Sequence, residues 1–272
     1  MMNVVLMRLR VLALVPLALV TTGCFQFATS IHVKGDGSGT LNQTLLFTAA
    51  AIDQFRGLAL LGGGNGRTFD PVSEEQARAA AATLGPGVSY ISSTPISGNQ
   101  GQGRDIVYAF TDINQLRLSE GPQLLGGARI RAQGLTNTAP VSFTFARQAS
   151  GTALLRIIVP RPSATAGAAL APTGRGQLSP DQVAMFKQML VGARLSIVVE
   201  PDGSIVRTNS QYVDGARVTL IDVSLDQLLD DAVLTRLQQV QTEEDAKAAL
   251  ANIPGVKVNF DQELAIEFTP SP

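Results

Sequence analysis

The chain has 272 residues, of which 45% are hydrophobic and only 16% are charged, against roughly 25% in an average soluble domain. Lysine and arginine number 21 and aspartate and glutamate 22, so the chain lacks the basic excess expected of a nucleic-acid-binding protein. It contains one cysteine, Cys24, and one histidine, His32. A disulfide within the chain and a thiolate metal site are therefore excluded, and any Ser-His-Asp or Cys-His site must use His32.

The amino terminus has the plan of a secretory signal. Arg8 and Arg10 precede an apolar run at residues 11–20, and small residues then lead to Cys24. The run is about half as long as the roughly 20 residues that a transmembrane helix needs. It ends on Gly23-Cys24, which resembles the lipobox of bacterial lipoproteins, although Thr21 replaces the usual leucine. The alternatives are an ordinary signal peptide and a buried hydrophobic helix.

The lipobox resemblance implies that residues 1–23 are removed and that Cys24 is the lipid-attachment residue, bearing palmitate or similar acyl chains. Several chains on one residue would give stable anchoring. Phe25 follows, and by the same resemblance the absence of Asp there is compatible with the outer membrane. We therefore expect an exported body anchored by lipid in the cell envelope, with the membrane as its first partner and no nucleic-acid partner.

A strand pattern begins directly after Cys24. Phe25, Phe27, Ile31 and Val33 alternate with mostly polar residues, which predicts a strand with one buried face. His32 falls on the polar face and is interpreted as a surface histidine. A glycine-rich turn at residues 35–39 and a returning strand at 41–47 predict a hairpin, and the turn does not have the acidic spacing of a calcium loop. The alternative is that residues 25–29 form a short tether.

Further strands are predicted along the chain. Residues 88–96 and 104–110 predict a second hairpin, and residues 141–145 and 154–159 a third strand pair. Residues 195–199 lead into Pro201-Asp202-Gly203, after which 205–212 should return alongside. Strands are also expected at 218–223, 256–260 and 264–268. The segments SIHVKGDGSGTL and SIVVEPDGSIVR are alike, which indicates either duplication or a common type of turn.

Capping boxes and apolar stripes predict helices at 49–60, 74–84, 179–190, 225–237 and 243–253. Residues 160–178 are rich in Pro, Gly and Ala and predict a linker or a long surface loop. The predicted fold class is therefore α+β, in which antiparallel hairpins form a sheet with several amphipathic helices on one face. Residues 24–272 are expected to form a single domain around this sheet.

The sequence predicts no catalytic, cofactor-binding or metal-binding residue. The nearest acidic cluster is Asp214, Asp222, Asp226, Asp230 and Asp231. Helix-start positions and solvated faces explain these acids better than a metal site does.

The segments DGSGTLNQTLLF, SEEQARAAAATLG, YAFTDINQLRL and SPDQVAMFKQML resemble an uncharacterised family of bacterial envelope lipoproteins, a resemblance that implies no activity. The first hypothesis is a non-catalytic, lipid-anchored protein that binds a partner protein or an envelope polymer. The second is a lipid-handling module whose cavity holds an acyl chain, motivated by apolar segments such as residues 58–61. An enzyme would need groups converging on His32 or on residues 222–231.

Overall fold

The computed structural model describes residues 25–49, 51–52, 73–98, 101–118, 140–159, 192–228, 230, 232–233, 236, 242–251 and 253–271. The predicted signal peptide, Cys24, the loop at 160–178 and the predicted helix at 179–190 lie outside these residues. Most of the predicted helix at 49–60 lies outside them as well.

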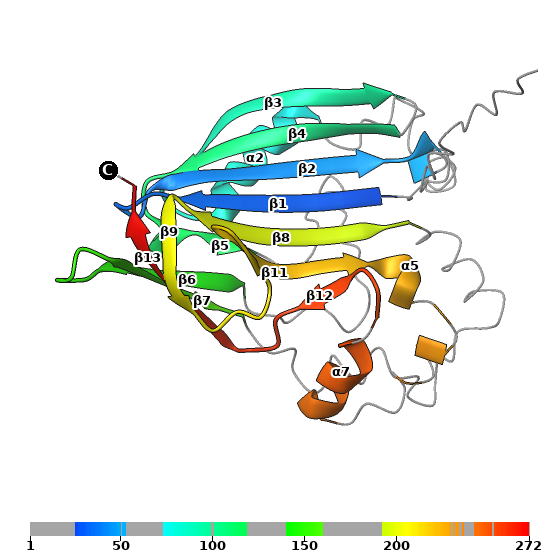
Figure 1. The fold of residues 1–272 in the computed structure, drawn as a ribbon. Coiled ribbons are helices and arrows are strands. Elements are labelled where there is room, and N and C mark those ends of the chain that lie inside the picture. Colours follow the sequence, from blue (N-terminus) through cyan, green and yellow to red (C-terminus); the bar gives the residue numbers. More distant parts are fainter. Residues whose placement is uncertain are drawn as a thin grey trace, which may run out of the picture.

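The described strands form two sheets (Figure 1). The larger sheet has eight strands in the order β10-β11-β8-β1-β2-β4-β3, with β12 paired to β11; the smaller has five in the order β5-β6-β7-β13-β9. The larger sheet comprises β1 (Phe25–Val33), β2 (Gly39–Phe47), β3 (Val88–Gly98), β4 (Gly101–Phe110), β8 (Arg194–Pro201), β10 (Val213–Asp214), β11 (Arg217–Ser224) and β12 (Val256–Val258). The smaller comprises β5 (Arg117–Leu118), β6 (Val141–Arg147), β7 (Ala153–Ile158), β9 (Gly203–Thr208) and β13 (Glu263–Pro270).

Strand β1 lies inside the larger sheet and is paired on both sides. It runs antiparallel to β2 and parallel to β8, so Ile31 sits between Leu41 and Val199. Its inner residues from Phe27 onward are buried, whereas its other face carries the partly exposed Ser30 and His32. The predicted strand, its hairpin with β2 and the placement of His32 on the polar face are confirmed.

The predicted α+β class, with several amphipathic helices covering one face, is wrong. The described α-helices are short: α2 (Glu74–Leu84), α5 (Leu225–Leu228) and α7 (Glu243–Leu250). One buried cluster instead joins both sheets, with Leu41 and Ile106 from the larger and Leu155, Ile157 and Ile266 from the smaller. Each alternating strand has one apolar face, and the two sheets bury those faces in a common core.

Helix α2 forms as its sequence predicts. The Ser73 hydroxyl accepts from the Gln76 N–H, and the Gln76 side chain accepts from the Ser73 N–H, which completes the capping box. Tyr108 of β4 is fully buried, and its hydroxyl donates to the Ala77 carbonyl at 2.8 Å. This bond fixes α2 to the larger sheet. In Figure 1 the helix lies behind β3 and β4.

The predicted hairpin across Pro201-Asp202-Gly203 is wrong. Strand β8 pairs with β1 and β11, whereas β9 pairs with β13 in the smaller sheet. The chain changes sheets at Asp202, whose N–H donates to the Val33 carbonyl at 2.7 Å. The two similar DGS segments thus fold differently, one as a hairpin and one as a crossover, and the duplication hypothesis gains no support.

Candidate functional site

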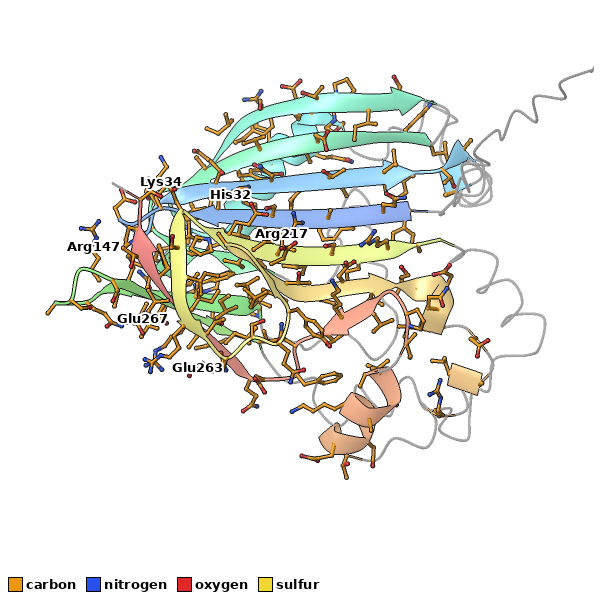
Figure 2. The ribbon with its side chains drawn as sticks, in the orientation of Figure 1. His32, Lys34, Arg147, Arg217, Glu263 and Glu267 are labelled. Atoms are coloured by element: carbon orange, nitrogen blue, oxygen red, sulfur yellow. The ribbon has the colours of Figure 1, made fainter. Side chains whose placement is uncertain are left out.

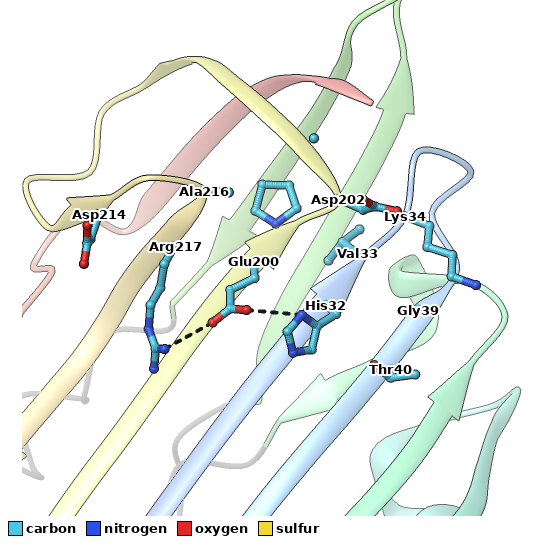
Figure 3. A pocket seen from close by; sticks show the side chains of 12 residues that line it. His32, Val33, Lys34, Gly39, Thr40, Glu200, Asp202, Asp214, Ala216 and Arg217 are labelled. Atoms are coloured by element: carbon cyan, nitrogen blue, oxygen red, sulfur yellow. Dashed lines mark ion pairs between the residues drawn. The ribbon is translucent and has the colours of Figure 1, made fainter. Parts of the chain in front are cut away.

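An open hollow of about 540 Å³ lies at the end of the larger sheet that is farther from Phe25 (Figure 3). It is lined by the last residues of β1 and β8, by the crossover into β9, and by the start of β11. The ionisable side chains around it are His32, Lys34, Glu200, Asp202, Asp214 and Arg217. Such a surface suits a polar partner, because the groups that orient a ligand are hydrogen-bonding side chains.

Strand register brings His32 and Glu200 together. Parallel pairing of β1 and β8 places the two residues side by side, and His32 Nδ1 lies 3.2 Å from Glu200 Oε2. The other carboxylate oxygen of Glu200 lies 3.3 Å from Nη1 of Arg217, on the neighbouring strand β11. Glu200 is 25% exposed, against 42% for His32 and 53% for Arg217. The carboxylate is therefore held between two partners at the solvent boundary.

Ser30, which lies outside the hollow, contacts the other side of the His32 ring. Its Oγ lies 3.3 Å from His32 Nε2, so Ser30, His32 and Glu200 follow the order of a nucleophile, a base and an orienting acid. A serine triad also needs donors for the oxyanion. Ser30 lies within a regular strand whose backbone is paired on both sides, and it is not among the residues lining the hollow. Ser30 therefore lies outside the hollow, and the paired strand around it offers no evident pair of free N–H donors for an oxyanion.

Three charged side chains at the hollow form no ion pair among the described residues. Lys34, Asp202 and Asp214 are exposed, and each is available to an incoming polar group. In the adjoining turn, the pKa of Asp36 is lowered because the Ser38 hydroxyl and N–H donate to its carboxylate, at 2.7 and 2.9 Å. This geometry agrees with the predicted turn.

The acidic cluster considered from the sequence is not assembled. Asp222 accepts from Nε and Nη2 of Arg194, both at 2.8 Å, and this contact raises the pKa of the Arg194 guanidinium. Asp226 and Asp230 accept backbone N–H groups near their own positions. Asp214 lies at the hollow, and Asp231 lies outside the described residues. No group of three potential metal ligands occurs in the part of the chain that the structure describes.

The contacts of Glu200 with His32 and Arg217 could not be predicted from the sequence. Both depend on pairing between β1, β8 and β11, which are far apart in the chain. The available signal was the alternation at 195–199, which places Glu200 on the same face as Ser196 and opposite Leu195, Ile197 and Val199. The predicted lipid-attachment residue Cys24 and the apolar segment 58–61 lie outside the described residues. No helix in the described ranges is long and apolar enough to cross a membrane.

Comparison with known proteins gives little further information. No family model and no curated protein matches the chain. Among solved structures, the folded domain of LppM from Mycobacterium tuberculosis is similar at a TM-score of 0.34 and 10% sequence identity. The match covers 92% of this chain and 95% of that domain. A TM-score this low does not establish a common fold.

Proposed function

We propose that the protein is a non-catalytic, lipid-anchored component of the cell envelope that binds a partner protein or an envelope polymer through the hollow. The observation that carries this proposal is the hollow itself, with its exposed Lys34, Asp202 and Asp214 around the His32–Glu200–Arg217 contacts. Charged and hydrogen-bonding side chains at an open surface suit a polar partner. They do not suit an acyl chain, so the hollow does not support the lipid-handling alternative.

The binding proposal is tested by site-specific photo-crosslinking in cells. A photoreactive amino acid replaces Lys34 at the hollow, and a second chain carries it at Glu75, an exposed position on α2. We expect defined crosslinked products from position 34 that are absent from position 75. Arg217→Glu should reduce these products, because it reverses a charge at the hollow. Equal crosslinking from both positions would contradict the proposal.

The anchoring proposal is tested separately at Cys24. Since this is the only cysteine, Cys24→Ser removes the only site that the lipobox resemblance offers for lipid. We expect the variant to leave the membrane fraction, while the unmodified chain stays in it. A Cys24→Ser chain that still sediments with membranes would show that the lipoprotein proposal is wrong.

The non-catalytic proposal is tested at Ser30 and His32. Because the paired strand around Ser30 offers no evident pair of free N–H donors for an oxyanion, we expect no ester hydrolysis above background with an activated ester such as p-nitrophenyl acetate. Hydrolysis that disappeared in both Ser30→Ala and His32→Ala would instead show that the Ser30–His32–Glu200 arrangement is catalytic.

A further inference from the structure

Charge is distributed unevenly along the strands of the larger sheet. At the end of the sheet where β1 begins, paired residues of β1, β2, β4 and β3 form two rows. We name these two rows the anchor end. One row contains Phe25, Phe47, Gln102 and Ser97, and the next contains Gln26, Leu46, Gly103 and Ile96. None of these residues is charged. Phe25, Leu46 and Ile96 are also partly exposed, so apolar surface reaches solvent here.

The opposite end of the same sheet is rich in charge. It carries the ionisable groups of the hollow and those of the neighbouring turns. Figure 2 shows His32, Lys34 and Arg217 at this end, with Arg147 of β6 and Glu267 of β13 on the smaller sheet beside it. Arg147 joins the smaller sheet to the β1–β2 turn, because its Nε donates to the Gly35 carbonyl at 2.6 Å. The strands thus run from an uncharged end to a charged one.

Two charged side chains lie next to the anchor end, Arg104 of β4 and Arg194 of β8, and each has a partner. Arg104 directly follows Gly103, and its Nη1 donates to the Ser93 hydroxyl at 2.9 Å. Arg194 of β8 pairs with Gln26 in the sheet, and both of its donating nitrogens contact the Asp222 carboxylate. A bidentate pair of this kind leaves no net charge. Moving an uncharged or neutralised group to a low-dielectric surface costs less free energy than moving an isolated charge there.

The larger sheet begins at Phe25, the residue that follows Cys24 in the sequence. Phe25 pairs with Phe47, and Gln26 pairs with both Leu46 and Arg194. Strand pairing therefore begins at the first residue after the predicted attachment site, and consecutive Cα atoms are only about 3.8 Å apart. The predicted strand start at Phe25 is therefore confirmed, and the tether alternative is not.

We propose that the anchor end is a lipid-contacting surface, so that the larger sheet stands on the bilayer with its strands pointing away from it. The hollow then faces the aqueous side. Between Phe25 and His32 the strand spans roughly 23 Å, which sets the height of the hollow. This inference depends on the proposed lipid anchoring, but the uncharged rows and their partly exposed apolar side chains support it independently.

The proposal is tested with two cysteines on one strand. Ser97→Cys and Ser89→Cys both alter exposed serines of β3, about 26 Å apart along the strand. The full-length chain is purified with its lipid, which occupies the sulfur of Cys24, and the new thiol is labelled with a fluorophore. The protein is then reconstituted into phosphatidylcholine vesicles that contain nitroxide-labelled acyl chains. We expect quenching at position 97 to exceed quenching at position 89 several-fold.

The outcomes distinguish contact of the anchor end with the bilayer, which we call seating, from lipid anchoring through Cys24. Equal quenching at the two positions, or stronger quenching at position 89, would overturn the seating proposal while leaving the anchor intact. A lipidated chain that failed to float with the vesicles would contradict both proposals. A circular dichroism spectrum identical to that of the unsubstituted chain shows that each variant is folded.

Discussion

Glu200 contacts two side chains at the hollow, and the cost of losing its charge distinguishes a binding role from a structural one. Its partners His32 and Arg217 are about half exposed, and ion pairs of this kind contribute roughly 0–1 kcal/mol each. We therefore expect Glu200→Gln, which weakens both contacts, to lower the free energy of unfolding by no more than about 2 kcal/mol. Urea denaturation measures this change, and the crosslinks from position 34 should fall in the same variant.

The matched control for Glu200 is Glu263→Gln. Glu263 also pairs with an exposed arginine, Arg156, but it lies on β13 and does not line the hollow. We expect the control to lose a similarly small free energy and to keep its crosslinks from position 34. A loss above about 3 kcal/mol in Glu200→Gln alone would indicate that Glu200 maintains the fold.

At the scale of secondary-structure elements, Tyr108 connects β4 to α2 and makes that contact sensitive to high pH. Burial raises the pKa of Tyr108 to about 12, with a smaller contribution from Tyr90 nearby. The folded state therefore favours the neutral phenol, which alone can donate to the Ala77 carbonyl. This stability is present below the ordinary tyrosine pKa of about 10 and is lost as the pH rises from there through about 12.

The test compares urea denaturation of the unsubstituted chain and Tyr108→Phe across this range. Tyr108→Phe should be less stable by about 1–3 kcal/mol near neutral pH, because the Ala77 carbonyl loses its donor. Tyr108→Phe has no phenol to ionise, so its free energy of unfolding should fall less as the pH rises. The free energies of unfolding of the two chains should therefore converge at high pH. Parallel curves across the whole range would contradict the assigned role.

Elements formed by neighbouring segments were predictable from the sequence, and pairings between distant segments were not. The hairpins β1–β2 and β3–β4 and the pair β6–β7 join strands across short connections, and each was predicted from alternation and turn residues. The Ser73 capping box likewise marked the start of α2. The parallel pairing of β1 with β8 and the crossover into β9 depend on contacts that no local pattern specifies.

The same limit explains the incorrect fold class and the incomplete site. An apolar strand face does not reveal whether a helix or a second sheet will cover it. Ser30 and His32 were visible as polar residues of one strand, but Glu200 and Arg217 reach them only through β8 and β11. For the whole molecule, the shared core is therefore the main feature that the sequence did not reveal.

The shared core predicts that the two sheets unfold together. Leu155 of β7 is fully buried in the cluster that also contains Leu41 and Ile106 of the larger sheet. Leu155→Ala should lower the free energy of unfolding by about 2–5 kcal/mol, because it leaves a cavity in the core. In a Tyr212→Phe background, Tyr90 and Tyr108 are the only tyrosines, and both lie on the larger sheet.

The fluorescence of Tyr90 and Tyr108 therefore reports unfolding of the larger sheet, whereas Leu155→Ala alters the smaller sheet. We expect the tyrosine and circular dichroism transitions in urea to shift by the same amount. Ile158→Ala is the control, because the neighbouring Ile158 is 43% exposed and should have little effect. A tyrosine transition that did not move would show that the sheets unfold independently. A joint transition would support a rigid connection between the anchor end and the hollow, as the proposed seating on the bilayer requires.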